Sequence, residues 1–498
     1  MGRLDNNSLR DKGVKAEPSR SPGRSPFAPA STWSASSDRL YGAHQAAKHS
    51  WRFVGWLGLC LVLAFHPGSA RAVPAFAVQT GQPCQACHVG GFGPQLTPFG
   101  REFKLHGYTL RAVKWNVPLL GMVVSSFTNT GASQNPPPKN FAPNNNLAVD
   151  QVSLFVAGGL GDHLGAFIQT TYDGVAHAFH WDNLDVRGVT TANLGKHSAV
   201  LGVSLNNAPT VEDAWNTTPA WGFPYTSSTL VPAPSASPLL SGGLAQEVIG
   251  GTAYAWIDDA FYLEAGAYGS PTAKELTRLG VDPTSPGSIS GLAPYARVAY
   301  QKGLGQGVLE IGAFGMSTRI YPGLDQSLGL TDLYDDVGLD SSWYVMRSNG
   351  DVFTLQGHLI HEDAYLNYTC ASAALAGYLD CNRVTGLNDL RADASYYFRN
   401  QFGATLQLFR TFGSGNAYLY QIVDGNRVAR PDTEGFTVQV DATPWGAGKS
   451  PFGPRFNART GIQYTYYAEF NGARSNYDGL GSQPSNNNAF RVFLWIAY

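Results

Sequence analysis

The chain has 498 residues, a length that allows about two to four domains. Only 14% of its residues are charged and 12% are aromatic, which excludes a disordered chain and a charged coiled coil. Residues 1–72 carry 10 basic and 4 acidic side chains, which leaves residues 73–498 with 24 basic and 32 acidic side chains, a net charge of −8. Because phosphate binding needs clustered cations, we expect no nucleic-acid partner.

The first predicted element is a secretory signal. The longest apolar run, Phe53–Phe65, has 13 residues and is shorter than the about 20 that a membrane-spanning helix needs. It follows basic residues and precedes Ala70-Arg71-Ala72, a small-x-small cleavage site, so we expect cleavage before Val73. We interpret residues 1–72 as an N-terminal extension plus signal peptide, with translation starting nearer the apolar run.

The five cysteines separate into three groups. Cys60 is removed with the signal, and Cys84 and Cys87 belong to Cys84-Gln85-Ala86-Cys87-His88, the C-x-x-C-H pattern of covalent haem c attachment. The alternatives for this pair are a disulfide or half of a zinc site, although no second ligand pair is evident. For Cys370 and Cys381 in an exported protein, we expect a structural disulfide.

A short helix is predicted directly after this motif. Thr97 followed by Pro98 is typical of an N-cap and first helical residue, and Gly107 of a helix stop. Phe99, Phe103 and His106 would then share one face. That face could cover haem or pack on protein. Residues 73–110 are too few to fold readily alone, so we expect the rest of the chain to enclose them.

The remaining residues, 111–498, alternate between apolar and polar with a period of two. The pattern is clear in residues 151–156, 353–359, 391–399, 436–441 and 456–465, and the chain ends on an alternating, aromatic-terminated run, 490–498. Apolar-out, polar-in alternation predicts an all-β fold, a transmembrane antiparallel β-barrel of about 16 strands, with a soluble sandwich or barrel as the alternative. We expect residues 159–163 to form a short periplasmic turn, and Ala132–Asn146 and Thr217–Ser241 to form external loops.

The segment 74–108 resembles the fused monohaem cytochrome c–porin family of bacterial outer membranes, whose best-known members oxidise Fe(II). The residues that carry the resemblance are Pro74-Ala-Phe-Ala, Gln79-Thr-Gly81, Cys84–His88, Pro94-x-Leu96, Phe99-Gly-Arg101, Phe103-Lys104 and Gly107-Tyr108. The resemblance implies an outer-membrane barrel with the small haem c domain acting as a plug in its lumen.

These observations give a functional hypothesis. Cys84 and Cys87 would hold one haem c, with His88 as proximal ligand of its iron; His106 is the first candidate for the sixth ligand and Met122 the second, with an open site or His358 as further options. The protein would pass electrons from an extracellular donor, with Fe(II) as a candidate, to a periplasmic carrier such as a soluble cytochrome. Alternatives are a porin whose haem only plugs the lumen and a haem enzyme such as a peroxidase.

Overall fold

The structure is a computed structural model that describes residues 75–112, 119–447, 450–452 and 456–498. The predicted signal peptide lies outside these residues. Within them, no helix is long and apolar enough to cross a membrane.

The described part of the chain begins with a helical segment and continues as a single sheet. The helical segment, residues 75–112, contains α2 (Ala75–Thr80), α3 (Cys84–Cys87), η1 (Val89–Gly91) and α4 (Pro98–Leu105). The strands are β1 (Leu119–Thr130), β2 (Asn146–Gly159), β3 (Leu164–Asp173), β4 (Ala178–Leu194), β5 (His197–Asn206), β6 (Ile249–Ile257), β7 (Phe261–Gly269), β8 (Gly287–Ile289), β9 (Ala293–Leu304), β10 (Gly307–Pro322), β11 (Asp332–Met346), β12 (Val352–Tyr365), β13 (Val384–Phe398), β14 (Phe402–Gly413), β15 (Thr433–Ala442), β16 (Asn457–Glu469) and β17 (Ala489–Ala497).

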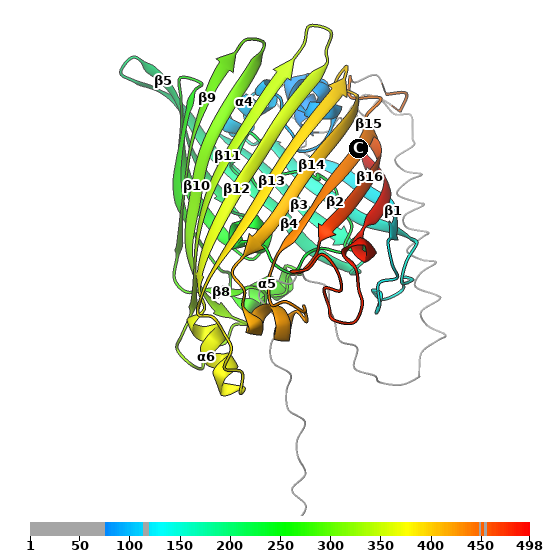
Figure 1. The fold of residues 1–498 in the computed structure, drawn as a ribbon. Coiled ribbons are helices and arrows are strands. Elements are labelled where there is room, and N and C mark those ends of the chain that lie inside the picture. The colour runs from blue at the N-terminus through cyan, green and yellow to red at the C-terminus, as the bar shows by residue number, and fades with distance from the viewer. Residues whose placement is uncertain (1–74, 113–118, 448–449, 453–455) are drawn as a thin grey trace, which may run out of the picture.

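The sheet closes on itself, as Figure 1 shows, because β1 pairs with both β2 and β17. All strand pairs are antiparallel, and each long strand pairs with its neighbours in the chain. The three-residue β8 pairs with β10 beyond the end of β9, so the wall consists of 16 long strands. The predicted all-β barrel of about 16 strands is confirmed.

The alternating pattern places apolar side chains outside and polar side chains inside. On β12, Leu355 and Leu359 are 47% and 38% exposed on the outer face, whereas Thr354, Gln356 and His358 are buried on the inner face. The same division holds on β17, where Val492 and Leu494 point outward and Arg491 inward. An apolar exterior around a polar interior is the architecture of porin-like outer-membrane barrels.

The two ends of the barrel differ. One end, here called the short-turn end, has connections of two to five residues, such as 160–163 and 399–401, together with the longer connection 443–456. The C-terminus lies at this end (Figure 1). The other end, the loop end, carries the long connections, with α5 (Ala273–Arg278), α6 (Asn367–Leu375), η3 (Ala417–Val423) and η4 (Pro484–Asn487). There Cys370 and Cys381 form the predicted disulfide, with an S–S distance of 1.99 Å.

Two stretches of chain fill the lumen. The helical segment lies inside the short-turn end (α4 in Figure 1), and residues 207–248, here called the inward loop, fold into the barrel between β5 and β6. The prediction that Thr217–Ser241 forms an external loop is therefore wrong. The loop turns inward because Trp215, 1% exposed, packs on Trp256 and Tyr262 of the barrel wall, and because Leu239 and Leu240 join the apolar core near the loop end.

Candidate functional site

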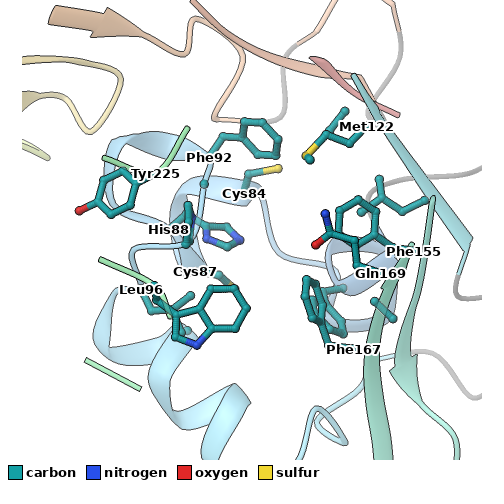
Figure 2. A pocket seen from close by; sticks show the side chains of 18 of the residues that line it. Cys84, Cys87, His88, Phe92, Leu96, Met122, Phe155, Phe167, Gln169 and Tyr225 are labelled. Atoms are coloured by element: carbon teal, nitrogen blue, oxygen red, sulfur yellow. The ribbon is translucent and has the colours of Figure 1, made fainter. Parts of the chain in front are cut away.

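The C-x-x-C-H motif folds as a single helical turn that ends at His88. The backbone N–H of His88 donates to Cys84 O at 2.9 Å, which closes the turn of α3. Cys84 and Cys87 are free thiols, not a disulfide. Figure 2 shows both cysteines and the His88 ring at the same cavity. The thiols and the imidazole that haem c attachment requires are therefore together on one face of the segment.

Helix α4 supports this turn from the side. Thr97 is the N-cap as predicted, and its hydroxyl accepts from Gly100 N at 3.2 Å, while the backbone N–H of Thr97 donates to Cys87 O at 2.9 Å. A side chain at Gly100 would come within 2.2 Å of Cys87 O, so only glycine allows the helix to lie this close to the motif. The sequence of α4 is thus fitted to the C-x-x-C-H turn.

The cavity has a volume of about 360 Å³, within the range of about 300–1,000 Å³ that small-molecule and cofactor sites occupy. Its lining includes Cys84, Cys87, His88 and Met122. His106 and His358 are not part of the lining. The ring of His106 instead lies 2.8 Å from Glu102 O, and His358 Nδ1 lies 2.6 Å from Thr217 O of the inward loop.

The predicted aromatic face of α4 is only partly realised. Phe103 is buried and lines the cavity, where it packs on Phe76 with ring centroids 4.8 Å apart. Phe99 is 41% exposed, and His106 lies outside the cavity. The helix turns one aromatic residue of the predicted face toward the site, because its other neighbours are the inward loop and the wall strands β4–β6.

The barrel wall opposite the motif departs from the polar-in pattern. The inward residues of four neighbouring strands are apolar near the short-turn end: Leu120, Met122 and Val124 on β1, Phe155 and Ala157 on β2, Phe167 on β3, and Trp495 and Ala497 on β17. Farther along the same strands the inward residues become polar, as Ser126, Ser153 and Gln169 show. This apolar wall faces the cysteines and His88 across the cavity (Figure 2).

The end of the cavity nearer the loop end is polar, and a carboxylate lies there. Asp182 on β4 accepts at 2.7 Å from both Gln169 Nε2 and Thr171 Oγ1. Three further amides donate to it at 3.2 Å, from Gln151, Asn183 and Gln246. These donors are all neutral, so the negative charge of Asp182 is solvated by dipoles rather than paired with a cation.

The electrostatics of the segment reflect its burial. Burial lowers the pKa of the His88 imidazole to about 4, and its Nδ1 atom is buried without a hydrogen-bond partner. Burial, followed by repulsion from Arg187, lowers the pKa of Lys104 to about 7. The Lys104 ammonium donates to Val211 O and Asp213 O at 2.5 and 2.9 Å, which connects α4 to the inward loop.

The donor set and its surroundings fit a haem. Two free thiols and a neutral imidazole with an unpartnered buried nitrogen face an apolar cavity, as the attachment of an apolar macrocycle requires. The zinc alternative finds less support, because no group of three or more His, Cys, Asp or Glu residues in the described part of the chain could hold a metal ion.

The sequence identified the motif but missed the cavity wall. Phe155, Phe167 and Trp495 look like ordinary strand residues, and Asp182 looks like one of many lumenal carboxylates. One signal was available, because Leu119-Leu120-Gly121-Met122-Val123-Val124 is apolar on both faces where a barrel strand should alternate. Such a strand has apolar contacts on its inner face as well as with lipid.

Comparisons with known proteins find similarity among solved structures. No family model matches the sequence, and no curated protein matches it. Among solved structures, an anion-selective porin from Comamonas acidovorans is similar with a TM-score of 0.43 and 13% identity, over 76% of this chain and 98% of that chain. The outer membrane channel DcaP of Acinetobacter baumannii gives 0.41 and 13%, over 76% and 96%. OmpT of Vibrio cholerae gives 0.39 and 8%, over 78% and 98%.

Proposed function

We propose that this protein is a bacterial outer-membrane barrel that carries one covalently bound haem c and passes electrons from an extracellular donor to a periplasmic acceptor. The observation that carries the proposal is the match between the two sides of the cavity. The thiols and imidazole of a haem attachment motif face four strands whose inward residues are apolar opposite the motif. The inner face of a barrel with a water-filled lumen is polar, so such a barrel would not need an apolar wall at this position.

The residues of the chain have separate parts in this proposal. Cys84 and Cys87 would hold the macrocycle covalently and His88 would supply the proximal nitrogen. Phe155, Phe167 and Trp495 would exclude water from the opposite face, which raises a haem's reduction potential. When bound, haem c supplies a one-electron carrier.

Met122 is the better candidate for the sixth ligand. Of the residues that the sequence raised for this role, it is the one that lines the cavity, and it projects inward from β1 with 9% exposure. His106 and His358 are held elsewhere by backbone carbonyls. A thioether ligand raises the reduction potential, which suits a carrier that accepts electrons from a weak reductant.

The position of the site determines which partner can reach it. Short turns lie on the periplasmic side of outer-membrane barrels, so the segment at the short-turn end would face the periplasm and a periplasmic acceptor such as a soluble cytochrome. The 16 long strands have 9 to 17 residues, which spans about 30–55 Å. An extracellular donor would therefore have to be small and enter the lumen. Asp182, at the polar end of the cavity, would attract a cation, which keeps Fe(II) as the leading candidate.

A second function has its own support. The helical segment and the inward loop both fill the lumen and are hydrogen-bonded to the wall, so the segment and its haem would act as a plug in a porin-like barrel without redox turnover. In that case, electrons would not pass through the protein, and solute flux would be its relevant activity.

One set of measurements separates these functions. Purified full-length protein should show a c-type haem spectrum, and stopped-flow mixing with Fe(II) should reduce it, followed by re-oxidation by a periplasmic cytochrome. Solute flux into liposomes without redox turnover would favour the porin. A colourless protein would exclude the haem proposal in both forms, and rapid peroxide consumption would favour an enzyme.

A further inference from the structure

The backbone around His88 is held by three polar side chains of the barrel, here called the barrel clamp: Asn400, Asn457 and Arg459. Asn400 lies in the three-residue turn 399–401 between β13 and β14, and the other two lie at the start of β16. The clamp residues are more than 300 positions away from the motif in sequence, and each is at most 3% exposed. The clamp therefore belongs to the barrel, not to the helical segment.

Asn400 makes more hydrogen bonds to the helical segment than either of the other two clamp residues. Its Oδ1 atom accepts from Gly90 N at 2.6 Å, and its Nδ2 atom donates to His88 O at 3.0 Å and to Gln85 O at 3.1 Å. One amide side chain thus satisfies three backbone groups that flank the predicted iron ligand. A buried side chain that uses both donor and acceptor in this way fixes the position of the backbone it binds.

A glycine after His88 allows the hydrogen bonds between the segment and Asn400. Gly90 has φ +70°, and a side chain there would come within 2.7 Å of the Tyr397 ring. Any other residue would force the segment away from β13 and from Asn400. The glycine is therefore needed for the close approach that lets the clamp reach the motif.

The other two clamp residues bind the backbone directly after Gly90. Asn457 Nδ2 donates to Gly91 O at 3.3 Å, and Arg459 Nη1 donates to Phe92 O at 2.7 Å. Arg459 is itself held by an ion pair with Asp441 at 2.9 Å and by a hydrogen bond to the Tyr397 hydroxyl. The clamp is thus rigid at its barrel side, because its members are fixed by strands β13, β15 and β16.

We propose that Asn400 is a positioning residue for His88, so that a turn of the barrel sets the axial geometry and the reduction potential of the haem. This inference rests on the proposed function, because it concerns the ligand of a bound haem. Partners that orient a metal-ligating histidine govern the strength of its bond to the metal. Here the orientation acts through the backbone carbonyl of His88 and the neighbouring Gly90 N–H, both held by Asn400.

Two variants of Asn400 test the proposal in the full-length protein. Asn400→Gly keeps the positive φ of +53° and removes all three bonds, whereas Asn400→Asp keeps the acceptor for Gly90 N–H and removes both donors. The control is Asp259→Gly, because the turn 258–260 between β6 and β7 has the same length, and its first two residues have φ +52° and +53°. Covalent haem content, optical spectrum and midpoint potential are measured for each.

We expect all three variants to retain covalent haem. In Asn400→Gly, the ferric-to-ferrous ratio at a fixed ambient potential should change by about tenfold, if the loss of Asn400 acts on the redox equilibrium as strongly as loss of an outer partner acts on metal affinity at the low end of its range. Asn400→Asp should shift the ratio toward ferric haem, because it removes both donors and adds a buried negative charge beside His88 O and Gln85 O, and Asp259→Gly should match the natural protein. If Asn400→Gly does not accumulate as a barrel, an unchanged ratio in Asn400→Asp would overturn the proposal.

The failures can be told apart. If the natural protein carries no covalent haem, the proposed function is wrong and this inference falls with it. If the natural protein carries haem and the Asn400 variants that fold have its spectrum and potential, the positioning role is wrong while the proposed function stands.

Discussion

The two stretches that fill the lumen differ in what lies in front of their side chains. In the helical segment, residues 75–112, barrel side chains hold the backbone around the motif, and the side chains of Cys84, Cys87 and His88 face a cavity. Barrel side chains also hold the backbone of the inward loop, residues 207–248, where Glu362 accepts from Leu239 N and Gln356 donates to Trp215 O, and the loop adds bonds from its own side chains. The segment thus leaves the thiols and the imidazole of the motif open to the cavity.

Asp213 illustrates the loop's arrangement. Its carboxylate accepts from the backbone N–H groups of Trp215, Thr217 and Thr218 at 2.8 to 3.1 Å and forms an ion pair with Arg297 at 3.4 Å. His88 Nδ1, by contrast, has no partner. Unpartnered buried polar atoms also occur in the loop, at Glu212 and Glu247, so what distinguishes the segment is that its motif faces the cavity.

The largest expected effect follows from removing the proximal ligand. In His88→Ala, haem should still attach through the thiols, but the iron should lose its low-spin optical spectrum because a strong axial nitrogen is gone. The barrel should persist, since its strand pairs do not involve the segment. His358→Ala is the matched control, a lumenal histidine bound to Thr217 O, and its spectrum should be unchanged. A surviving low-spin spectrum in His88→Ala would contradict the ligand assignment.

The next effect concerns the inward loop. Asp213→Ala leaves three buried N–H groups without an acceptor and should destabilise the loop by about 2–4 kcal/mol. Single-channel conductance in planar bilayers should rise while the haem spectrum stays the same. Asp282→Ala, in the exposed connection between β7 and β9, is the control. Unchanged conductance in Asp213→Ala would show that the loop does not restrict the lumen.

A smaller effect tests the apolar wall. Met122→Leu conserves volume and should cost little stability, but it removes the thioether. We expect the sulfur-to-iron charge-transfer band to disappear and the midpoint potential to fall. Met316→Leu on β10 is the control, because Met316 is 5% exposed in the lumenal core near the loop end and does not line the cavity. Equal potentials for the two variants would leave the sixth position to another ligand.

Local patterns in the sequence predicted the fold well. Alternation predicted the barrel, Thr97-Pro98 predicted the start of α4, and the disulfide followed from the count of cysteines. Each of these depends on residues close together in the chain or on a pattern repeated many times. The C-x-x-C-H motif is also local, which is why the sequence could identify Cys84, Cys87 and His88 together.

Contacts between residues far apart in the chain could not be predicted from the sequence. The inward loop has the Pro- and Ser-rich composition of an external loop, and its direction depends on partners such as Arg297, 84 positions from Asp213. Asn400 resembles any turn residue, although it binds His88 across 312 positions. The placement of Met122 over the cavity, and of His106 away from it, depends equally on how the segment docks. The amino-acid composition of a segment does not show which distant residues it will contact.

The smallest effect is expected at the loop end. It tests whether the disulfide there influences the cavity at the other end of the barrel. Replacing Cys370 and Cys381 by Ser opens a loop of 11 residues, a local loss of about 3 kcal/mol by the chain-entropy account. Protease cleavage near α6 should accelerate, whereas conductance and haem potential should not change, because both inserts are held by other contacts. A shift in haem potential would show that the loop end is coupled to the cavity. The separation between the site at the short-turn end and the disulfide at the loop end would then be incomplete.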